Sequence, residues 1–253
     1  MPELSVLMSC FNAEKTVKRA IQSILNQSFE NFEFIIIDDC SSDATPQILD
    51  QYQKQDPRIR VLTNESNLGL AASLNKGIGV CNCPIIARMD ADDHALPQRF
   101  QLQLAFFNAN EEVDILGSAV QTYYPKTDRL GNVIVLPSNH VDIIKRIFKK
   151  TLVFHPTIMI RKKIFDEIAQ YDPHLKWAED SDLWYRIYDK VTFHNLEEPL
   201  LIYTVKSRLN WKIISQNWKV KTRNLQDRKM LFRYLPFVVY ASLSQIFRSI
   251  TAS

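Results

Sequence analysis

The chain has 253 residues, of which 46% are hydrophobic and 23% are charged, as is usual for a soluble protein with a sizeable core. Five glycines argue against collagen-like or low-complexity segments, and no run of 18 apolar residues predicts a membrane-spanning helix. The net charge of +3 is unevenly divided, because residues 204–253 hold ten Lys/Arg and one acid, whereas residues 1–203 hold 21 Lys/Arg and 27 acids.

Strand and helix signals alternate through the first ninety residues. Apolar runs predict strands, and apolar positions spaced three and four apart predict helices. The expected strands are residues 4–9, 33–39, 59–62 and 84–89, separated by helices at 14–28, after a cap at Ser41 or Ser42, and near 70–79. This order predicts an α/β fold, with a mostly parallel sheet flanked by helices on both faces.

After residue 93 the pattern is less regular. We expect helices at 97–108, 139–149 and 179–188, strands at 113–120, 157–160, 191–194 and 200–204, and a hairpin or loop at 121–138. From about Trp211 the chain is expected to be helical. The change in composition near residue 204 predicts one domain over residues 1–204 and a basic, amphipathic helical extension over 205–253.

The segment Arg-Met-Asp-Ala-Asp-Asp at 88–93 closes the fourth apolar run. Asp90 and Asp92 lie two residues apart, so their side chains point the same way if the strand continues through them. Paired carboxylates suit Mg²⁺ or Mn²⁺, and Mg²⁺ completes its coordination with substrate phosphates. The alternative is a pair of solvated loop carboxylates.

Acidic residues also end the second predicted strand, at Asp38 and Asp39. In open α/β sheets ligands bind at the carboxyl ends of the strands. A carboxylate there can accept a hydrogen bond from a uracil ring or a ribose hydroxyl. The alternative is a simple turn and helix cap, which accounts for Ser42 and Asp43 better than for the Asp38–Asp39 pair.

Several motifs together resemble one large family. The chain resembles the inverting family-2 glycosyltransferases with the GT-A fold, of the type that builds bacterial cell-surface polysaccharides. The resemblance covers roughly residues 4–205. It is carried, in the family's order, by Ser5–Asn12, by Asp38-Asp39-x-Ser-x-Asp, by Asn67-x-Gly69, by Asp90-x-Asp92 and by Glu179-Asp180.

The resemblance implies a nucleotide site. Ser9, Phe11 and Asp39 match positions that hold the base and ribose, although many relatives carry Tyr instead of Phe11. Asp90 matches a contact to ribose or metal, and Asp92 matches the ligand of the divalent cation, Mn²⁺ or Mg²⁺. Arg88 is outside the signature. On an extended strand it shares the face of these acids, where it can meet a diphosphate or form a salt bridge with them.

Glu179 and Asp180 begin a predicted helix. Acids in a first helical turn are commonly present because they interact favourably with the helix dipole. The resemblance instead implies a catalytic base, because an attacking hydroxyl must lose its proton; we favour Asp180 over Glu179. We expect His155 to be structural beside the acceptor and His94 to support the loop after the acidic motif. A histidine common in relatives near 203–208 is missing here.

The basic extension holds an apolar helical stripe at 231–250 with Lys and Arg upstream. An apolar helix beside basic residues suits the surface of an anionic membrane. The alternatives are a helix packed on the body and a dimer contact. No nucleic-acid-binding module is visible, so nucleic acid is not an expected partner.

The resemblance implies a metal-dependent inverting transfer of a sugar from a nucleotide-sugar donor, for which a UDP-sugar is expected, to a hydroxyl of a glycan or lipid-linked glycan. Without a signal peptide, the protein is expected in the cytoplasm, peripheral at the inner face of the membrane. The alternative function is a non-catalytic, membrane-recruited binding subunit of a glycan-assembly complex. A nucleotidyltransferase or dehydrogenase is disfavoured, because no glycine-rich loop follows the first strand.

Overall fold

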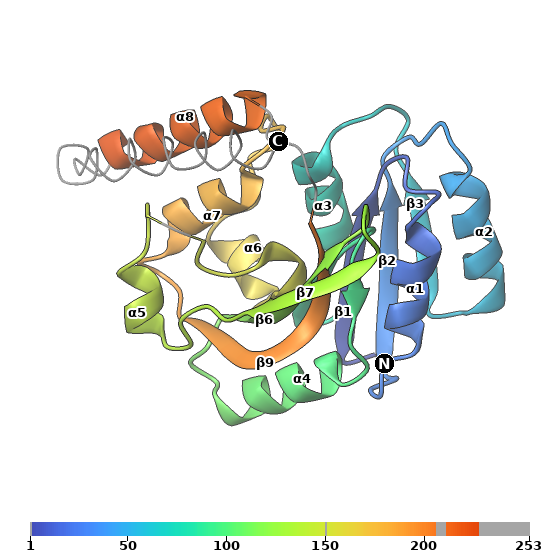
Figure 1. Cartoon of the computed structure of the whole chain (residues 1–253), viewed down its shortest axis with the longest axis horizontal. Helices are drawn as coiled ribbons and strands as arrows, with labels where there is room; N and C mark the ends of the chain where they lie inside the picture. The colour runs from blue at the N-terminus through green and yellow to red at the C-terminus, as the bar shows by residue number, and fades with distance from the viewer. Residues whose placement is uncertain (1, 150, 206–210, 228–253) are drawn as a thin grey trace.

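The computed structural model describes residues 2–149, 151–205 and 211–227 (Figure 1). Nine strands form one sheet in the order β3-β2-β1-β4-β8-β6-β9-β5, with β7 paired to β6. The strands are β1 (Leu4–Cys10), β2 (Phe32–Asp38), β3 (Ile59–Thr63), β4 (Ile85–Asp90), β5 (His94–Ala95), β6 (Ile115–Tyr124), β7 (Arg129–Ile134), β8 (Met159–Arg161) and β9 (Phe193–Thr204). The helices are α1 (Val17–Leu25), α2 (Thr45–Gln55), α3 (Leu70–Ile78), α4 (Arg99–Ala109), α5 (His140–Ile144), α6 (Lys163–Glu167), α7 (Glu179–Ile187) and α8 (Trp211–Asp227), with a 3₁₀ turn at His155–Thr157.

The first four strands are all parallel, as the alternating pattern predicts. Their side chains alternate between two apolar cores, because successive residues of a strand point to opposite faces. Met8 packs with α1 and α2 on one face, and Leu7 packs with α3 on the other. The expected α/β fold with helices on both faces is confirmed, and the carboxyl ends of β1, β2 and β4 meet at one edge (Figure 1).

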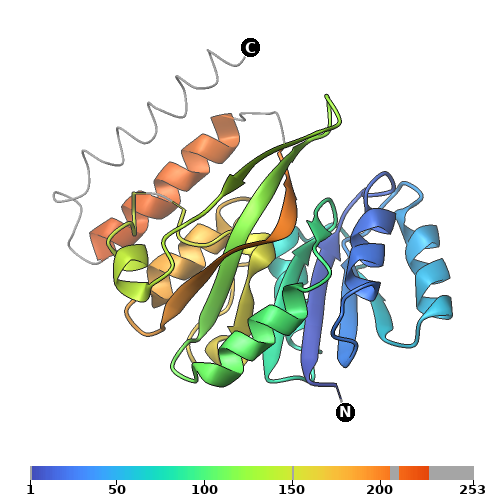
Figure 2. The same cartoon turned by 60° about the horizontal axis from the view of Figure 1, so that its bottom comes forward.

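The second half of the sheet is mixed. β8 runs antiparallel to both β4 and β6, whereas β9 runs parallel to β6. Residues 121–138 were expected to form a hairpin or a loop, and Figure 2 shows a hairpin, formed by β6 and β7, that reaches past the rest of the sheet. The two strands expected at 191–194 and 200–204 form one bulged strand, β9. The register of its pairing with β6 shifts between Ser118 and Val120, which accommodates the less regular residues between the two expected strands.

Two other local expectations differ from the structure, and two short elements were not expected. Neither Ser41 nor Ser42 caps α2: the Asp43 carboxylate accepts a hydrogen bond from the Thr45 amide, while the Ser41 hydroxyl accepts one from the Asn12 amide. The helix expected at 139–149 is regular only in α5. The short elements β5 and α6 were not predicted, since two to five residues carry too little periodicity to stand out.

α8 packs against α7, and it buries Val220 and Leu225. Leu225 belongs to the same apolar core as Leu183 and Trp184 of α7. The helix expected at 231–250 lies outside the described residues. Among the residues that are described, none of the helices is both long enough and apolar enough to cross a membrane.

Candidate active site at the carboxyl edge of the sheet

Three carboxylates gather where β4 ends. Oxygen atoms of Asp90, Asp92 and Asp93 all lie within 4.8 Å of one another. The condition set for a shared face, a strand that continues through Asp92, is not met, because β4 ends at Asp90 and a turn follows. The turn nevertheless brings the carboxylates together, and three hard oxygen donors this close fit a divalent cation such as Mn²⁺ or Mg²⁺.

Asp93 was not singled out from the sequence, although it directly follows the acidic pair. Its side chain is buried, and one oxygen accepts a 2.7 Å hydrogen bond from the Thr204 amide. Burial, together with the neighbouring charge of Asp90, raises the pKa of Asp93 to about 8. A cluster of this kind gathers negative charge that a cation can offset.

Residues from α1 and β9 hold the acidic turn in place. Arg19 donates a 2.8 Å hydrogen bond to the Asp92 carbonyl and a 3.3 Å bond to the Thr204 hydroxyl. The Thr204 hydroxyl also donates to the Asp92 carbonyl. The Arg19 guanidinium lies 5.1 Å from the centre of the Tyr123 ring, on β6. The position of the carboxylates therefore depends on β9, which lies more than 100 residues along the chain.

Arg88 lies buried on β4, two residues before Asp90. One terminal nitrogen of its guanidinium pairs with the Asp90 carboxylate, so the salt bridge considered as an alternative for Arg88 is present. Its Nε and Nη1 atoms have no hydrogen-bond partner within the described parts of the chain. The positive charge lowers the pKa of both Glu179 and Asp180 against the stronger effect of burial. Arg88 thus links the acids of β4 electrostatically to those of α7.

Glu179 and Asp180 begin α7, as expected. The preceding residue, Ala178, has a left-handed backbone with φ of 64°, which turns the chain into the helix. Burial and the adjacent Asp180 raise the pKa of Glu179 to about 7. Burial also raises the pKa of Asp180, whose Oδ1 accepts a hydrogen bond from the Ser181 amide. Two adjacent carboxyls with raised pKa values are typical of sites for proton transfer.

His155 lies beside this pair. Its Nδ1 atom is 3.8 Å from a Glu179 oxygen, and its Nε2 atom shares a 2.8 Å hydrogen bond with the Tyr171 hydroxyl. Burial, followed by the charge of Arg88, lowers the pKa of His155 well below its ordinary value. The imidazole is therefore neutral and is positioned by Tyr171, which agrees with the structural role expected for it.

The raised pKa of Glu179 has a consequence for stability. The folded protein retains this proton up to about pH 7, whereas the unfolded chain loses it near the ordinary value of 4.5, so ionisation of Glu179 favours unfolding as the pH rises. Glu179→Gln is expected to raise the Tm by several degrees at pH 8 and to leave it nearly unchanged at pH 5. Melting curves in EDTA at both pH values test this; an equal shift at both pH values contradicts it.

The residues expected at the nucleotide lie across β1 and β2. Phe11 follows β1 with 49% of its surface exposed, and Ser9 pairs in register with Asp90. The Asp39 carboxylate accepts 2.8 Å bonds from the amides of Leu68 and Gly69. The Asn64 side chain donates a third bond to it. A carboxylate has about four acceptor positions, so one remains on Asp39.

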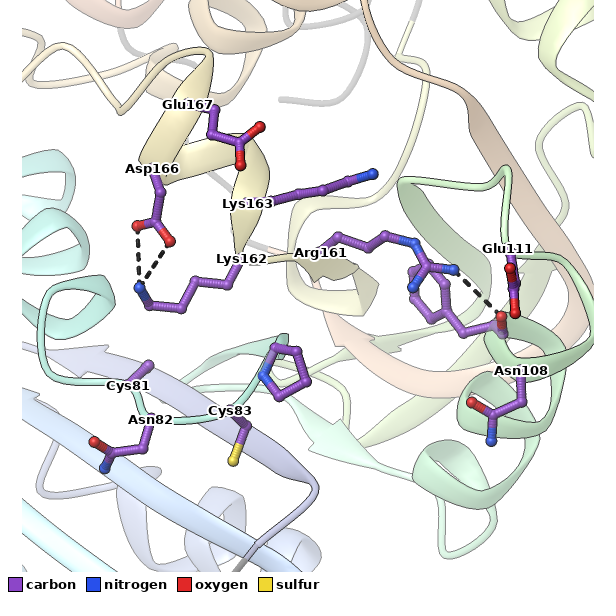
Figure 3. Close-up of a pocket in the computed structure, with 12 residues that line it drawn as sticks. Cys81, Asn82, Cys83, Asn108, Glu111, Arg161, Lys162, Lys163, Asp166 and Glu167 are labelled. Carbon is purple, nitrogen blue, oxygen red and sulfur yellow. Dashed lines mark hydrogen bonds and ion pairs between the residues drawn. The ribbon is translucent and has the colours of Figure 1, made fainter.

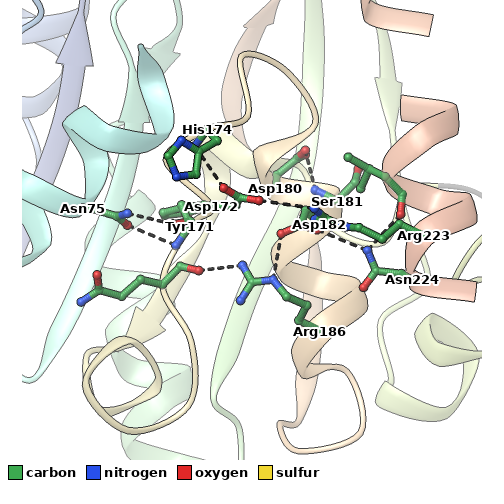
Figure 4. A network of polar contacts seen from close by, with 12 residues as sticks. Asn75, Tyr171, Asp172, His174, Asp180, Ser181, Asp182, Arg186, Arg223 and Asn224 are labelled. Atoms are coloured by element: carbon green, nitrogen blue, oxygen red, sulfur yellow. Dashed lines mark hydrogen bonds and ion pairs between the residues drawn. The ribbon is translucent and has the colours of Figure 1, made fainter. Parts of the chain in front are cut away.

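A third acid of α7, Asp182, anchors the helix to α8 (Figure 4). Asp182 is fully buried, and one oxygen accepts a 2.8 Å bond from Arg186. The other oxygen accepts bonds from Arg223 and Asn224 of α8. Arg223 also lies 3.5 Å from Asp172 in the loop before α7. Sequence reasoning missed this contact, for which the only local signal is the i, i+4 spacing of Asp182 and Arg186.

Removing Arg223 leaves a buried carboxylate with one charged partner fewer. Since a hydrogen bond to a charged group contributes about 1.5–3 kcal/mol, we expect Arg223→Ala to lower the free energy of unfolding by that amount. Thermal and urea unfolding measure the effect. As a control, Lys54→Ala removes an exposed ion pair with Asp50 on α2 and should change stability by less than about 1 kcal/mol. Equal effects of the two variants contradict a stabilising role for the α7–α8 contact.

A separate pocket of about 660 Å³ lies at the opposite edge of the sheet, beside the start of β4 (Figure 3). Arg161 in its wall donates to the Val113 carbonyl, and Lys162 pairs with Asp166. None of the residues expected to be functional lines this pocket. The predicted site residues instead gather at the carboxyl edge, at the ends of β1, β2 and β4 and the start of α7.

Comparisons with known proteins identify the family of the chain. Residues 5–169 match the family model for glycosyl transferase family 2. The chain is 37% identical over 217 residues to the uncharacterized glycosyltransferase MJ1057 of Methanocaldococcus jannaschii, covering 83% of this chain and 73% of that protein. It is 32% identical over 230 residues to the O-antigen biosynthesis glycosyltransferase WbnJ of Escherichia coli, covering 88% of each.

Solved structures of S. aureus TarS share the fold. The TarS 1-349 structure in complex with UDP-GlcNAc superposes with a TM-score of 0.72 at 18% identity, covering 93% of this chain and 72% of that chain. The match spans 65% of another TarS 1-349 chain and 43% of the longer TarS chain. The fold is thus GT-A. Because the family model covers well over half of the sequence, and relatives above 30% identity cover most of it, this protein belongs to glycosyl transferase family 2 and is a glycosyltransferase.

Proposed function

We propose that the protein transfers a sugar from a nucleotide-sugar donor, a UDP-sugar, to a hydroxyl of a glycan or lipid-linked glycan in cell-surface polysaccharide synthesis. The observation that carries the proposal is the convergence of strand-end carboxylates and the α7 acids around Arg88. The names of WbnJ and of the teichuronic acid biosynthesis relative TuaG support the pathway class. The UDP and UDP-GlcNAc complexes of TarS support the donor class.

Asp90 and Asp92, with Asp93 behind them, are the residues that would hold Mn²⁺ or Mg²⁺. When bound, the cation supplies a Lewis acid that offsets negative charge on the departing nucleoside diphosphate. Arg88 contributes a second positive charge, and its two unpartnered nitrogens are free to donate hydrogen bonds to the diphosphate. The exposed Phe11 ring stacks on the base, while Ser9 and the remaining acceptor position of Asp39 orient the nucleoside.

Asp180 is the base. Its carboxylate takes the proton of the acceptor hydroxyl as that oxygen attacks the anomeric carbon, and the bond from this carbon to the diphosphate breaks. Attack from the face opposite the leaving group inverts the anomeric centre. Glu179, whose pKa is about 7, shares the negative charge of the pair, and the neutral His155 lies against it.

The extension at 205–253 is proposed to bring the catalytic domain, residues 1–204, to the cytoplasmic face of an anionic membrane. Its excess of basic residues supports this, since each basic group near such a surface contributes about 1 kcal/mol. The described part of the extension, α8, also packs on α7. The apolar stripe at 231–250 lies outside the described residues, and its part in membrane binding stays a prediction.

The proposal is tested with a panel of nucleotide sugars and Mn²⁺ or Mg²⁺, measuring release of nucleoside diphosphate. Metal-dependent release from a UDP-sugar is expected, with inverted configuration in any glycoside formed. The second candidate is a non-catalytic binding subunit of a glycan-assembly complex. Calorimetry that detects glycan binding, but no metal-dependent binding of UDP, favours that candidate and contradicts the enzymatic proposal.

A further inference from the structure

A pocket of about 430 Å³ lies between α8 and the loop that precedes α7. This volume is within the range of small-molecule sites, about 300–1,000 Å³. None of the residues assigned above to the donor, the metal or the base lines it. The lining residues are Leu175, Trp177, Ser215, Gln216, Lys219, Val220 and Arg223.

Both walls of this pocket are connected to the helix that carries the proposed base. Trp177 lies in the loop that enters α7, and Asp180 follows three residues later. On the other wall, Arg223 contacts Asp182 in the first turn of the same helix, as Figure 4 shows. The pocket is therefore connected to Asp180, the proposed base, by three residues of chain on one wall and by the Arg223–Asp182 contact on the other.

The lining has the chemistry of a site for a charged sugar. The indole of Trp177 offers an apolar, planar surface, and the C–H face of a pyranose ring packs well on such a surface. Ser215 and Gln216 offer polar groups for sugar hydroxyls. The pocket has two cations and no acid. Arg223 is already engaged by Asp172 and Asp182, whereas Lys219 forms no ion pair within the part of the chain that the structure describes.

We propose that this pocket binds the acceptor glycan, and that Lys219 selects a glycan carrying a phosphate or a carboxylate close to the accepting hydroxyl. The inference rests on the proposed glycosyl transfer and names the class of its acceptor. A lipid headgroup presents similar phosphate chemistry. However, the concave shape and the aromatic wall of the pocket suit a sugar ring. Binding to a membrane surface would instead use side chains that protrude from the protein.

The test uses an array of neutral, phosphorylated and uronate-containing oligosaccharides, on which retention of the labelled full-length protein is measured with UDP and Mn²⁺. Preferential retention on anionic glycans is expected. Trp177→Ala and Lys219→Glu should each weaken it about tenfold or more, equivalent to the loss of one charged or stacked contact. Lys219→Arg should restore binding.

A matched control is available on α8. Trp218 is 42% exposed and does not line the pocket, so Trp218→Ala should retain glycan as the wild type does. Melting temperatures show whether each variant is folded. Phosphorylated and uronate spots separate the two sources of charge. Vesicles of phosphatidylglycerol, compared with phosphatidylcholine, separate glycan from membrane.

Several results overturn the inference: equal retention on neutral and anionic glycans, retention unaffected by Trp177→Ala and Lys219→Glu, no retention on any glycan, or Lys219-dependent binding to anionic vesicles alone. Release of UDP by the wild type without acceptor is measured in parallel. If no UDP-sugar is cleaved, the proposed function fails; if cleavage occurs without pocket-dependent retention of glycans, only the acceptor assignment fails.

Discussion

Asp180→Asn is expected to lower kcat by about 10²- to 10⁴-fold, the usual contribution of a positioned general base. The amide is nearly isosteric with the carboxylate, but it cannot take a proton from the attacking hydroxyl. Donor affinity should change little, because Asp180 belongs to α7 and not to the strands proposed to hold the nucleotide. Steady-state kinetics with saturating UDP-sugar, together with calorimetric binding of UDP, measure the two effects separately.

The pH profile distinguishes a base from a merely structural acid. Burial raises the pKa of Asp180, so the wild-type kcat should fall as the pH drops through the titration of the Glu179–Asp180 pair. In the Asp180→Asn variant, the residual kcat should no longer show the fall at low pH that is caused by protonation of the base. Asp50→Asn, an exposed substitution on α2, is the matched control and should behave as wild type. A wild-type profile in Asp180→Asn would falsify the assignment.

Asp92→Asn should reduce transfer by about 100-fold or more, because a bound metal contributes several kcal/mol of charge stabilisation and 1.36 kcal/mol corresponds to tenfold. The affinity for Mn²⁺, measured directly by electron paramagnetic resonance, should fall in parallel. This readout does not depend on turnover. The fold should be unaffected, since Asp92 lies in a turn and its backbone carbonyl, which Arg19 and Thr204 contact, is retained.

The metal assignment has a clear point of failure. If Asp92→Asn binds Mn²⁺ as tightly as the wild type, or if the wild type releases UDP equally well in EDTA, the carboxylate cluster is not a metal site. Asp50→Asn again serves as the control, because it removes one acidic charge from α2, which packs on β3, and β2 and β1 separate β3 from β4 in the sheet. Its Mn²⁺ affinity should match that of the wild type.

The parallel half of the fold could be predicted because its signals are local. Apolar runs such as residues 34–37 indicate strands covered on both faces, and the structure places β2 there with both cores packed against it. The shared carboxyl edge then follows from parallel pairing, whereas the strand order β3-β2-β1-β4 is known only from the structure. In the mixed half, the strands expected at 113–120 and 157–160 correspond to β6 and β8, but the two-residue strand β5 was missed, because so short a segment acquires its structure from the strand it pairs with.

The amino-acid sequence alone determined which acids end the strands and start α7, since these positions follow from hydrophobic pattern and local motif. Only the tertiary structure decided how Asp93, Arg19 and Thr204 meet around the acidic turn, because their contacts join segments far apart along the chain. The same holds for Asp182 and Arg223. Such contacts leave no periodic signal in the sequence, because the partner of each side chain lies far away along the chain and meets it only in the folded protein. The burial that results then shifts the pKa of the side chain and so sets its charge.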